Sequence, residues 1–476
     1  MNMNMNMNKV IFFVFTTMLL NISINNIGMA VGSGEGSIIK ENIKNLQFVY
    51  LPDNRLPTYE IVFYFADGAL SDEVGSNGET SSMITLLTSG TKRYKQEEIS
   101  DFLEFYGAGI GGNVTHEYTY FVVGGLAKDL VPTVKMICHL FSQSVFPEDE
   151  LNKLKIRSKT AIENIISSPS ALTDRVFREV SLRETPYQKS AEISLQGIKN
   201  LNQKVLNKKL QYFRNIVKKR IYISSPKDAY LEAKKIISKD CAFNLSKSNF
   251  VRKINSADAQ QKNLQSYKDS KVFLVPMVNS TQAQIRVGRY LASEDVDDID
   301  LLHVGSEILG GSGFGSMLMQ ELREKRGLTY GASAFATPQR DYGRSMISTF
   351  TKTETTNEAI EVIKNVLAKL SQGDYEDSEL QKRIKYLKGK HPFGFERRSS
   401  YLKQLIYFDH IGRDYKYIYS FPDLIGKFSK EDVSKQMKKI FPWEKQVILV
   451  TGNPSLESEL TKKWGKVVIL DYKNFL

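Results

Sequence analysis

Hydrophobic positions recur along this chain in two rhythms, an alternation typical of strands and a three-and-four spacing typical of amphipathic helices. The stretch "FVYLPDNRLPTYEIVFYFADGAL" (48–70) alternates on both sides of a turn, so it predicts two strands. The helical spacing predicts helices over 79–87 and in "QEEISDFLEFYGAG". A strand in "NVTHEYTYFVVGGL" and two amphipathic helices in "DLVPTVKMICHLFSQSV" and "EDELNKLKIRSKTAIENII" follow.

The second part of the chain repeats this order of elements. Strands in "KVFLVPMVNSTQAQIRVGRY" precede helices in "DIDLLHVGSEIL" and "GSMLMQELREKRG", then strands in "GASAFATPQRDYGRSMISTFT" and two more helices. Gly327 ends its helix as Gly107 does in the first part. The repeat predicts an α+β fold of two homologous domains, 38–254 and 271–476, each a mainly antiparallel sheet packed with helices. The polar segment 255–270 is predicted to link them.

The start of the chain has the pattern of an export signal. Lys9 precedes the short apolar run "VIFFVFTTMLL", and small residues lead up to Ala30. We therefore expect a signal peptide over 1–30, an exported and periplasmic protein, and no stable transmembrane anchor after cleavage. A retained membrane anchor is the alternative, although the apolar run is shorter than the roughly 20 residues that span a bilayer.

The composition of the 476-residue chain is that of a globular protein, with 41% hydrophobic residues. The net charge of +12 comes from scattered lysines and arginines rather than from a clustered basic stripe with stacking aromatic residues. This pattern is typical of solvated helix faces and argues against nucleic acid binding.

The chain has two cysteines, Cys138 and Cys241, which excludes a framework of several disulfides. An exported protein can pair two cysteines; Cys138 lies in the apolar helix "VKMICHLF" and Cys241 in "KDCAFNL". We expect two separate buried thiols, with a disulfide as the alternative.

No local motif in the sequence supplies catalytic chemistry. The five histidines are too far apart along the chain for H-E-x-x-H or the inverted H-x-x-E-H, so a local zinc site is absent. "GAGIGG" (107–112) matches a dinucleotide fingerprint but follows a helix and precedes a strand, the reverse of the required context. The helix over 79–87 pairs an apolar face with a small hydroxylic one.

The segment "GFGSMLMQELREKRGLTYGASAFA" carries the most information in the chain. It resembles the second-domain signature of the insulinase/pitrilysin/mitochondrial-processing-peptidase superfamily, in its short bacterial form. Further blocks, among them "LTSGTKRYKQEEISDFLEFYGAGIGG", "SSPSALTDRVFREV" and "YLKGKHPFGFERRSSYLKQLIYF", are similar to family blocks and follow in the same order. The resemblance implies the two-domain fold of that superfamily.

The resemblance also implies that this chain has lost the zinc site. Aligned on "GT" (90–91), Ser81 and Thr85 stand where active members have two histidine ligands, and Ile84 stands where they have the general-base glutamate. The third ligand falls near 160–161, with Glu163 close but not clearly in register. A catalytic zinc needs three protein ligands and a base for its water, so we expect no metal and no cofactor in this chain.

A second feature of the family is retained. Active members use an arginine and a tyrosine seven residues apart to hold the substrate, and Arg323 and Tyr330 match that spacing. An arginine fork and a phenol suit a peptide carbonyl or a developing oxyanion.

The combination resembles the non-catalytic subunit of two-chain bacterial members. It implies a protein that is inactive alone, pairs as a heterodimer with a zinc-bearing homologous peptidase subunit, closes a chamber around an unfolded peptide and supplies Arg323 and Tyr330 to the partner's active site. The peptide would add to an exposed sheet edge, near which Asn113 falls. The alternative is a stand-alone pseudo-peptidase that binds peptides or acts as a scaffold in the envelope; an enzyme active alone would require a metal.

Overall fold

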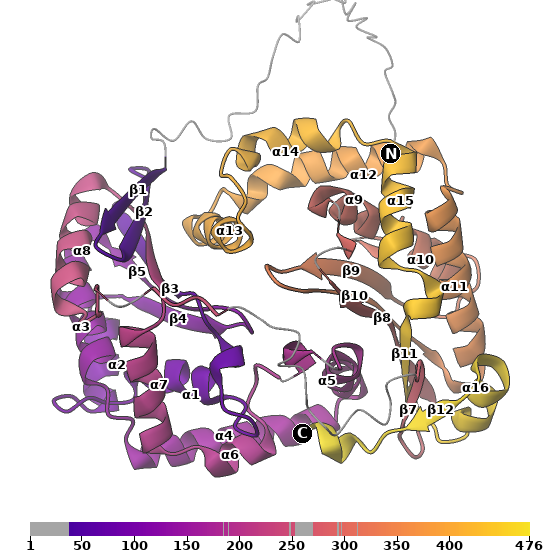
Figure 1. Ribbon diagram of the computed structural model, residues 1–476, viewed down its shortest axis with the longest axis horizontal. Helices are drawn as coiled ribbons and strands as arrows, with labels where there is room; N and C mark the ends of the chain where they lie inside the picture. The colour runs from indigo at the N-terminus through magenta and orange to yellow at the C-terminus, as the bar shows by residue number, and fades with distance from the viewer. Residues whose placement is uncertain are drawn as a thin grey trace, which may run out of the picture. The chain divides into compact units, whose positions relative to one another are not determined.

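Two six-stranded sheets form the framework of the described chain (Figure 1). The first has the strand order β1-β2-β6-β3-β5-β4 and the second β12-β7-β11-β8-β10-β9. Neighbours are antiparallel except in the pairs β2–β6, β7–β11 and β7–β12. The expected α+β class, with mainly antiparallel sheets, is therefore confirmed. The strands are β1 (Ile39–Ile43), β2 (Leu46–Pro52), β3 (Thr58–Phe65), β4 (Gly109–Val114), β5 (Thr119–Leu126), β6 (Lys219–Ser225), β7 (Val272–Pro276), β8 (Gln282–Leu291), β9 (Ala332–Pro338), β10 (Gly343–Lys352), β11 (Val447–Gly452) and β12 (Val467–Ile469).

A computed structural model describes the residues 38–183, 185–188, 190–246, 249–252, 270–292, 295–296, 298–311 and 313–476. The predicted signal peptide, 1–30, and all but the last residue of the predicted linker, 255–270, lie outside these residues. Within the described part, no helix has the length and apolar character needed to cross a membrane.

Helices pack on both sheets because their apolar residues recur at helical spacing. Those of the first part are α1 (Glu79–Thr85), α2 (Gln96–Phe105), α3 (Leu130–Gln143), α4 (Glu148–Ile166), α5 (Pro169–Ser181), α6 (Leu195–Asn200), α7 (Gln203–Asn215) and α8 (Lys227–Asp240). Those of the second part are α9 (Ile299–Gly310), α10 (Met317–Met319), α11 (Thr356–Gln372), α12 (Asp377–Lys390), α13 (Arg398–Ile411), α14 (Tyr417–Ile425), α15 (Lys430–Ile440) and α16 (Leu456–Trp464). A π-helical turn, Gln320–Glu324, extends α10.

The order of elements around the two sheets corresponds closely. The helix α1 follows β3 as α9 follows β8, and the edge strand β4 has its counterpart in the edge strand β9. Each sheet is completed by a strand late in its half, β6 or β11, which enters between two earlier strands. The residue boundaries predicted for the two domains stay a prediction.

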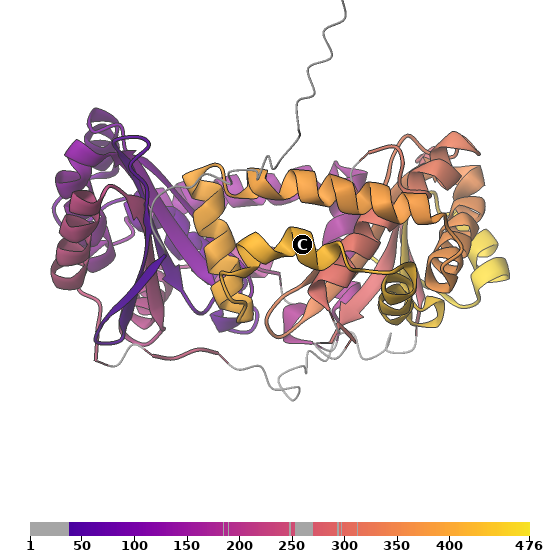
Figure 2. The ribbon, with the colours of Figure 1, turned by 90° about the horizontal axis from the view of Figure 1, so that it is seen from above.

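One helix from each half packs on the sheet of the other half. The helix α5 lies against β8 and β11, and its buried stripe of Leu172, Val176 and Phe177 joins a core with Phe273 and Leu449. In return α13, drawn in orange, lies against β3 and β6 of the first sheet (Figures 1 and 2). The sequence order alone does not reveal this exchange, because an apolar stripe at helical spacing predicts burial but not the surface that covers it.

The two cysteines form a disulfide, so the expectation of two separate thiols is wrong. Cys138 of α3 and Cys241, just after α8, are joined by an S–S bond of 2.03 Å. The helices α3 and α8 pack against each other, which brings the two fully buried sulfur atoms together across 103 residues of sequence. This proximity is a tertiary contact that no local pattern records.

Candidate functional site

The position aligned with the general base of active relatives is filled by hydrocarbon. Ile84 of α1 is 7% exposed and lies under the edge strand β4. A Cβ atom added to Gly112 of that strand would stand 2.4 Å from Cγ2 of Ile84. The strand can therefore approach the helix closely only because residue 112 is a glycine.

The hydroxyl groups of Ser81 and Thr85 are turned to the backbone of their own helix. Ser81 Oγ donates to the carbonyl oxygen of Gly78 at 3.1 Å, and Thr85 Oγ1 donates to that of Ser81 at 2.8 Å. The candidate third position is no better, since Glu163 is exposed on α4. These residues do not fit a zinc ion, which prefers imidazole, thiolate and carboxylate ligands. Among the described residues, no group of three or more His, Cys, Asp or Glu side chains is placed to hold a metal.

Buried charges hold the start of α1, which has no side-chain cap of its own. The Asp72 carboxylate accepts hydrogen bonds from the backbone N–H groups of Gly78 and Thr80 at 2.9 and 3.0 Å. Lys209 of α7 reaches both Asp72, at 3.3 Å, and Glu79, at 3.1 Å. Asp72 thus satisfies two of the N–H groups at the helix start, and both carboxylates complement its dipole.

The structure brings Arg323 to the backbone of Tyr330 rather than to its ring. Arg323 lies in the π-helical turn and donates from Nη1 to the carbonyl oxygen of Tyr330 at 3.0 Å. Its guanidinium also stands 4.6 Å from the ring centroid of Phe314. The Tyr330 side chain is 81% exposed. The two residues are thus neighbours at the surface, with the phenol open to solvent.

Arg323 also lines a cavity of about 560 Å³ beside β9 and β10. Ser170 of α5, the helix that packs on the second sheet, lines the same cavity, as do Gly331 and Ala332. Both halves of the chain therefore shape the surroundings of Arg323.

The strand β4 is an edge strand, as a peptide-adding sheet requires. In the described chain it pairs with β5 alone, and Asn113 is exposed on it. The strand contains three glycines, so few side chains obstruct a chain that approaches its free edge.

A buried polar network joins the two halves. The Glu117 carboxylate, 2.6 Å from His410 Nε2 of α13, also accepts hydrogen bonds from the Tyr187 hydroxyl at 2.8 Å and from the backbone N–H of Asp341 at 3.2 Å. Burial raises the pKa of Glu117, but His410 and Tyr187 outweigh it and hold this pKa below its usual value. Sequence reasoning missed this network, since its members are far apart along the chain.

The comparisons with known proteins give one sequence family and several solved structures. Residues 237–387, from the end of α8 into α12, match the sequence model of the family described as "Peptidase M16 inactive domain". No curated protein sequence gives a match.

The fold is shared with several solved structures. The peptidase M16 inactive domain from Pseudomonas fluorescens aligns with a TM-score of 0.77 over 87% of this chain and 98% of its own, at 21% identity. A protease from Helicobacter pylori aligns with a TM-score of 0.72 over 87% of this chain and 99% of its own, at 16% sequence identity. A conserved protein from Enterococcus faecalis V583 aligns with a TM-score of 0.71 over 88% of this chain and 99% of its own, at 15% sequence identity.

At these identities the solved structures establish the fold alone. The resemblance to the insulinase-like, or M16, peptidase superfamily is confirmed by the match of residues 237–387 to the model of its inactive domains.

Proposed function

We propose that this chain is the non-catalytic subunit of a zinc-dependent peptidase complex. The matches to inactive M16 domains support the coarser statement, a pseudo-peptidase. The finer statement adds that a zinc-bearing homologous subunit pairs with this chain, and that Arg323 and Tyr330 act on the peptide held in the partner's active site.

The observation that carries this proposal is the state of α1. Ile84 packs as hydrocarbon under β4, and the hydroxyls of Ser81 and Thr85 bond to backbone carbonyls. A chain with these groups at the metal position has no means of activating water, because a zinc peptidase needs three ligands and a base. Zinc, the metal of the partner, would supply the activated water of peptide hydrolysis.

The residues of this chain are suited to a positioning role. The carbonyl oxygen of Tyr330 and the ring of Phe314 hold the Arg323 guanidinium, while the Tyr330 phenol remains exposed. The remaining N–H donors of the guanidinium and the phenol are available to the carbonyl oxygen of a peptide. A substrate strand would add its backbone to the free edge of β4.

The disulfide supports the proposed export to a periplasm. Disulfides persist in oxidising compartments and are rare in the cytosol of mesophiles. The Cys138–Cys241 bond therefore suits a protein that folds after export.

The test is co-expression with a zinc-bearing homologue, followed by a peptide cleavage assay. We expect cleavage by the pair and by neither chain alone. Arg323→Ala should lower kcat/KM by about 100-fold, as expected for the loss of a donor to a developing oxyanion, and Tyr330→Phe by less. The matched control is Arg326→Ala, three residues on, whose guanidinium pairs with Glu321.

Unchanged cleavage in Arg323→Ala and Tyr330→Phe would contradict the role of these residues. Stoichiometric zinc in the purified single chain would contradict the assignment of α1. Peptide binding without cleavage alongside any zinc-bearing homologue would favour the stand-alone scaffold.

A further inference from the structure

Three neighbouring strands of the second sheet, β8, β10 and β9, carry basic residues but no acidic ones. Their sequences, "QAQIRVGRYL", "GRSMISTFTK" and "ASAFATP", contain three arginines and one lysine and neither aspartate nor glutamate. A surface with charges of one sign attracts ligands of the other sign.

Most of these basic residues lie on one face of the sheet, because side chains alternate along a strand. Arg344 shares this face with Met346, which packs in the core formed with α5. Lys352, exposed at the end of β10, and Arg286, paired across β8, lie on it too. Arg289 lies on the opposite face. We call the face with Arg286, Arg344 and Lys352 the basic face.

On this face, Arg286 is neutralised within the chain. Its Nε donates to the Asp174 carboxylate of α5 at 2.6 Å, and its Nη2 donates to the Ser170 hydroxyl at 2.9 Å. The carboxylate that α5 brings to this part of the sheet is thus engaged by a buried arginine.

The other charged residues of α5 interact with one another and with Glu192. Arg175 and Arg178 lie 3.3 and 3.9 Å from the Glu192 carboxylate. Burial raises the pKa of Glu179 to about 7, although the charges of Arg175 and Arg178 oppose this.

Arg344 has no such carboxylate partner in the described chain. No hydrogen bond or ion pair joins its guanidinium to a described residue, and its carbon Cζ stands 5.5 Å from the ring centroid of Phe335. Burial and the charge of Arg178 lower the pKa of Arg344, against Tyr342 and Asp174. A half-buried guanidinium without an acceptor costs free energy, which a carboxylate that reaches it would recover.

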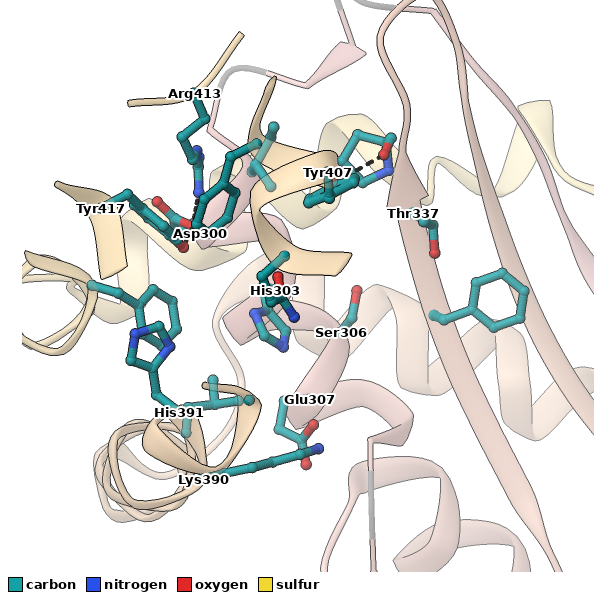
Figure 3. A pocket seen from close by; sticks show the side chains of 18 of the residues that line it. Asp300, His303, Ser306, Glu307, Thr337, Lys390, His391, Tyr407, Arg413 and Tyr417 are labelled. Atoms are coloured by element: carbon teal, nitrogen blue, oxygen red, sulfur yellow. Dashed lines mark hydrogen bonds and ion pairs between the residues drawn. The ribbon is translucent and has the colours of Figure 1, made fainter. Parts of the chain in front are cut away.

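The guanidinium of Arg344 is within reach of a ligand. The residue is half-buried, but its nitrogen atoms are not fully buried. Its cross-strand neighbour Thr337 and, further along the edge strand β9, Ser333 are both exposed. Thr337 also lies on the wall of a cavity of about 790 Å³ among α9, α12, α13 and α14 (Figure 3). Open space therefore adjoins β9 beside Arg344.

A second cation stands further along the same strands. The cavity of about 560 Å³ that Arg323 lines also reaches Ser333 and Ser348, and Arg323 is the one charged side chain among its described lining residues. Ser348 is four residues from Arg344 on β10, which corresponds to about 13 Å along a strand. An extended chain that follows β9 from one arginine to the other spans about four residues.

We propose that the basic face binds an extended acidic peptide, with a carboxylate of the peptide on the guanidinium of Arg344. A glutamate or aspartate side chain and a free peptide C-terminus both supply this group, and an arginine fork can bond both of its oxygens. The distance to Arg323 predicts that the carboxylate lies about four residues from the bond that is cleaved. This spacing rests on the proposed function, whereas carboxylate binding at Arg344 does not.

The test is a calorimetric titration of the full mature chain, without any partner and at low salt, with three nonapeptides. The first is acetyl-Ser-Gly-Ser-Ala-Glu-Ala-Ser-Gly-Ser-amide, the second has glutamine in place of glutamate, and the third is the glutamine peptide with a free C-terminal carboxylate. We expect the glutamate peptide to bind about tenfold more tightly than the capped glutamine peptide, as one charge-assisted hydrogen bond allows. In Arg344→Gln this difference should vanish, while the affinity of the capped glutamine peptide stays unchanged.

Further variants separate the site from folding and from net charge. Arg344→Met keeps an apolar stem beside Phe335 and should remove the preference for glutamate as Arg344→Gln does. Neither variant should lower the thermal midpoint, because the guanidinium has no hydrogen bond within the described chain to lose. Arg397→Gln removes the same charge from an exposed residue at the start of α13 and is the matched control.

Equal affinity for all three peptides, no binding of any to the folded chain, or a carboxylate preference that persists in both Arg344 variants would overturn the proposal. Loss of the preference in Arg397→Gln as well would reduce it to an effect of net charge and overturn the site. Binding that depends on the free C-terminus alone and is lost in Arg344→Gln would support the site and assign it to peptide ends.

The spacing is tested with a zinc-bearing homologue that cleaves peptides together with this chain. Glutamate moved along the substrate should raise kcat/KM most when it stands about four residues from the cleaved bond, and Arg344→Gln should remove this maximum. A profile without a maximum would overturn the spacing. Carboxylate binding at Arg344 in a chain that supports no cleavage with any partner would leave the site standing and refute the proposed function.

Discussion

The helices α1 and α9 occupy corresponding places in the two halves, yet they meet their edge strands in opposite ways. In the first half the bulky residue is on the helix, where Ile84 packs against Gly112 of β4. In the second half the glycine is on the helix, and a Cβ atom added to Gly310 would stand 2.4 Å from the backbone nitrogen of Ala334 in β9. Both helices approach their edge strands closely. In the first half the glycine that allows this approach is on the strand, and in the second half it is on the helix.

The difference decides what the polar face of each helix can do. The hydroxyls of Ser81 and Thr85 bond to the backbone of α1, whereas α9 contributes residues to the wall of a cavity of about 790 Å³. That cavity exists because the exchanged helix α13 contributes a wall to it, through Tyr407 and its neighbours. A functional surface therefore depends on what stands opposite a helix as much as on the helix itself.

The largest expected effect concerns the covalent link, which the first half has and the second half lacks. Replacing Cys138 and Cys241 together by alanine should lower the free energy of unfolding by about 4 kcal/mol, because the bond closes a long loop. Urea unfolding measures the loss, and the wild type with its disulfide reduced should show a similar one. Free thiols in the untreated protein, detected by mass spectrometry, would contradict the link.

The next effect concerns the packing under β4. Ile84→Glu places a carboxylate where hydrocarbon packs, and should cost about 3 kcal/mol of unfolding free energy without creating zinc affinity. The matched control is Thr85→Glu, one residue further along α1, where the side chain is exposed. A stable Ile84→Glu variant would mean that α1 is less tightly packed against β4 than the contact with Gly112 indicates.

The smallest effect concerns the link between Glu117 and α13. Glu117→Gln should cost about 2 kcal/mol near pH 7, because the buried carboxylate is paired with His410. The folded pKa of Glu117 lies below the unfolded value, so its contribution is present above that unfolded value, about 4.3, and is lost as pH falls through the folded pKa.

Urea midpoints measured between pH 7 and pH 3 test this linkage. The wild type should lose more stability on acidification than Glu117→Gln, and the exposed Glu163→Gln should follow the wild type. Parallel profiles for the wild type and Glu117→Gln would show that this carboxylate does not couple to folding.

Much of the fold follows from local patterns. Alternation and helical spacing predict most strands and helices in the right order, although the one strand predicted in "NVTHEYTYFVVGGL" is part of two, β4 and β5. The same order read twice predicts two similar sheets. The expectation that α1 holds no zinc is equally local, since Ser81, Ile84 and Thr85 carry no imidazole, thiolate or carboxylate in any fold. The spacing of Arg323 and Tyr330 is also a sequence property, although the structure bonds the guanidinium to the carbonyl of Tyr330 rather than to its phenol.

The sequence by itself therefore determined the fold class, the internal repeat and the absence of a metal motif in α1. The tertiary structure alone decided that α5 and α13 exchange sheets, that Cys138 meets Cys241, and that α9 and α13 line one cavity. The physical reason is range: local patterns report neighbours two to four residues apart, whereas these contacts join groups about a hundred or more residues apart. Which helix face packs on which sheet face is determined only when the whole core packs.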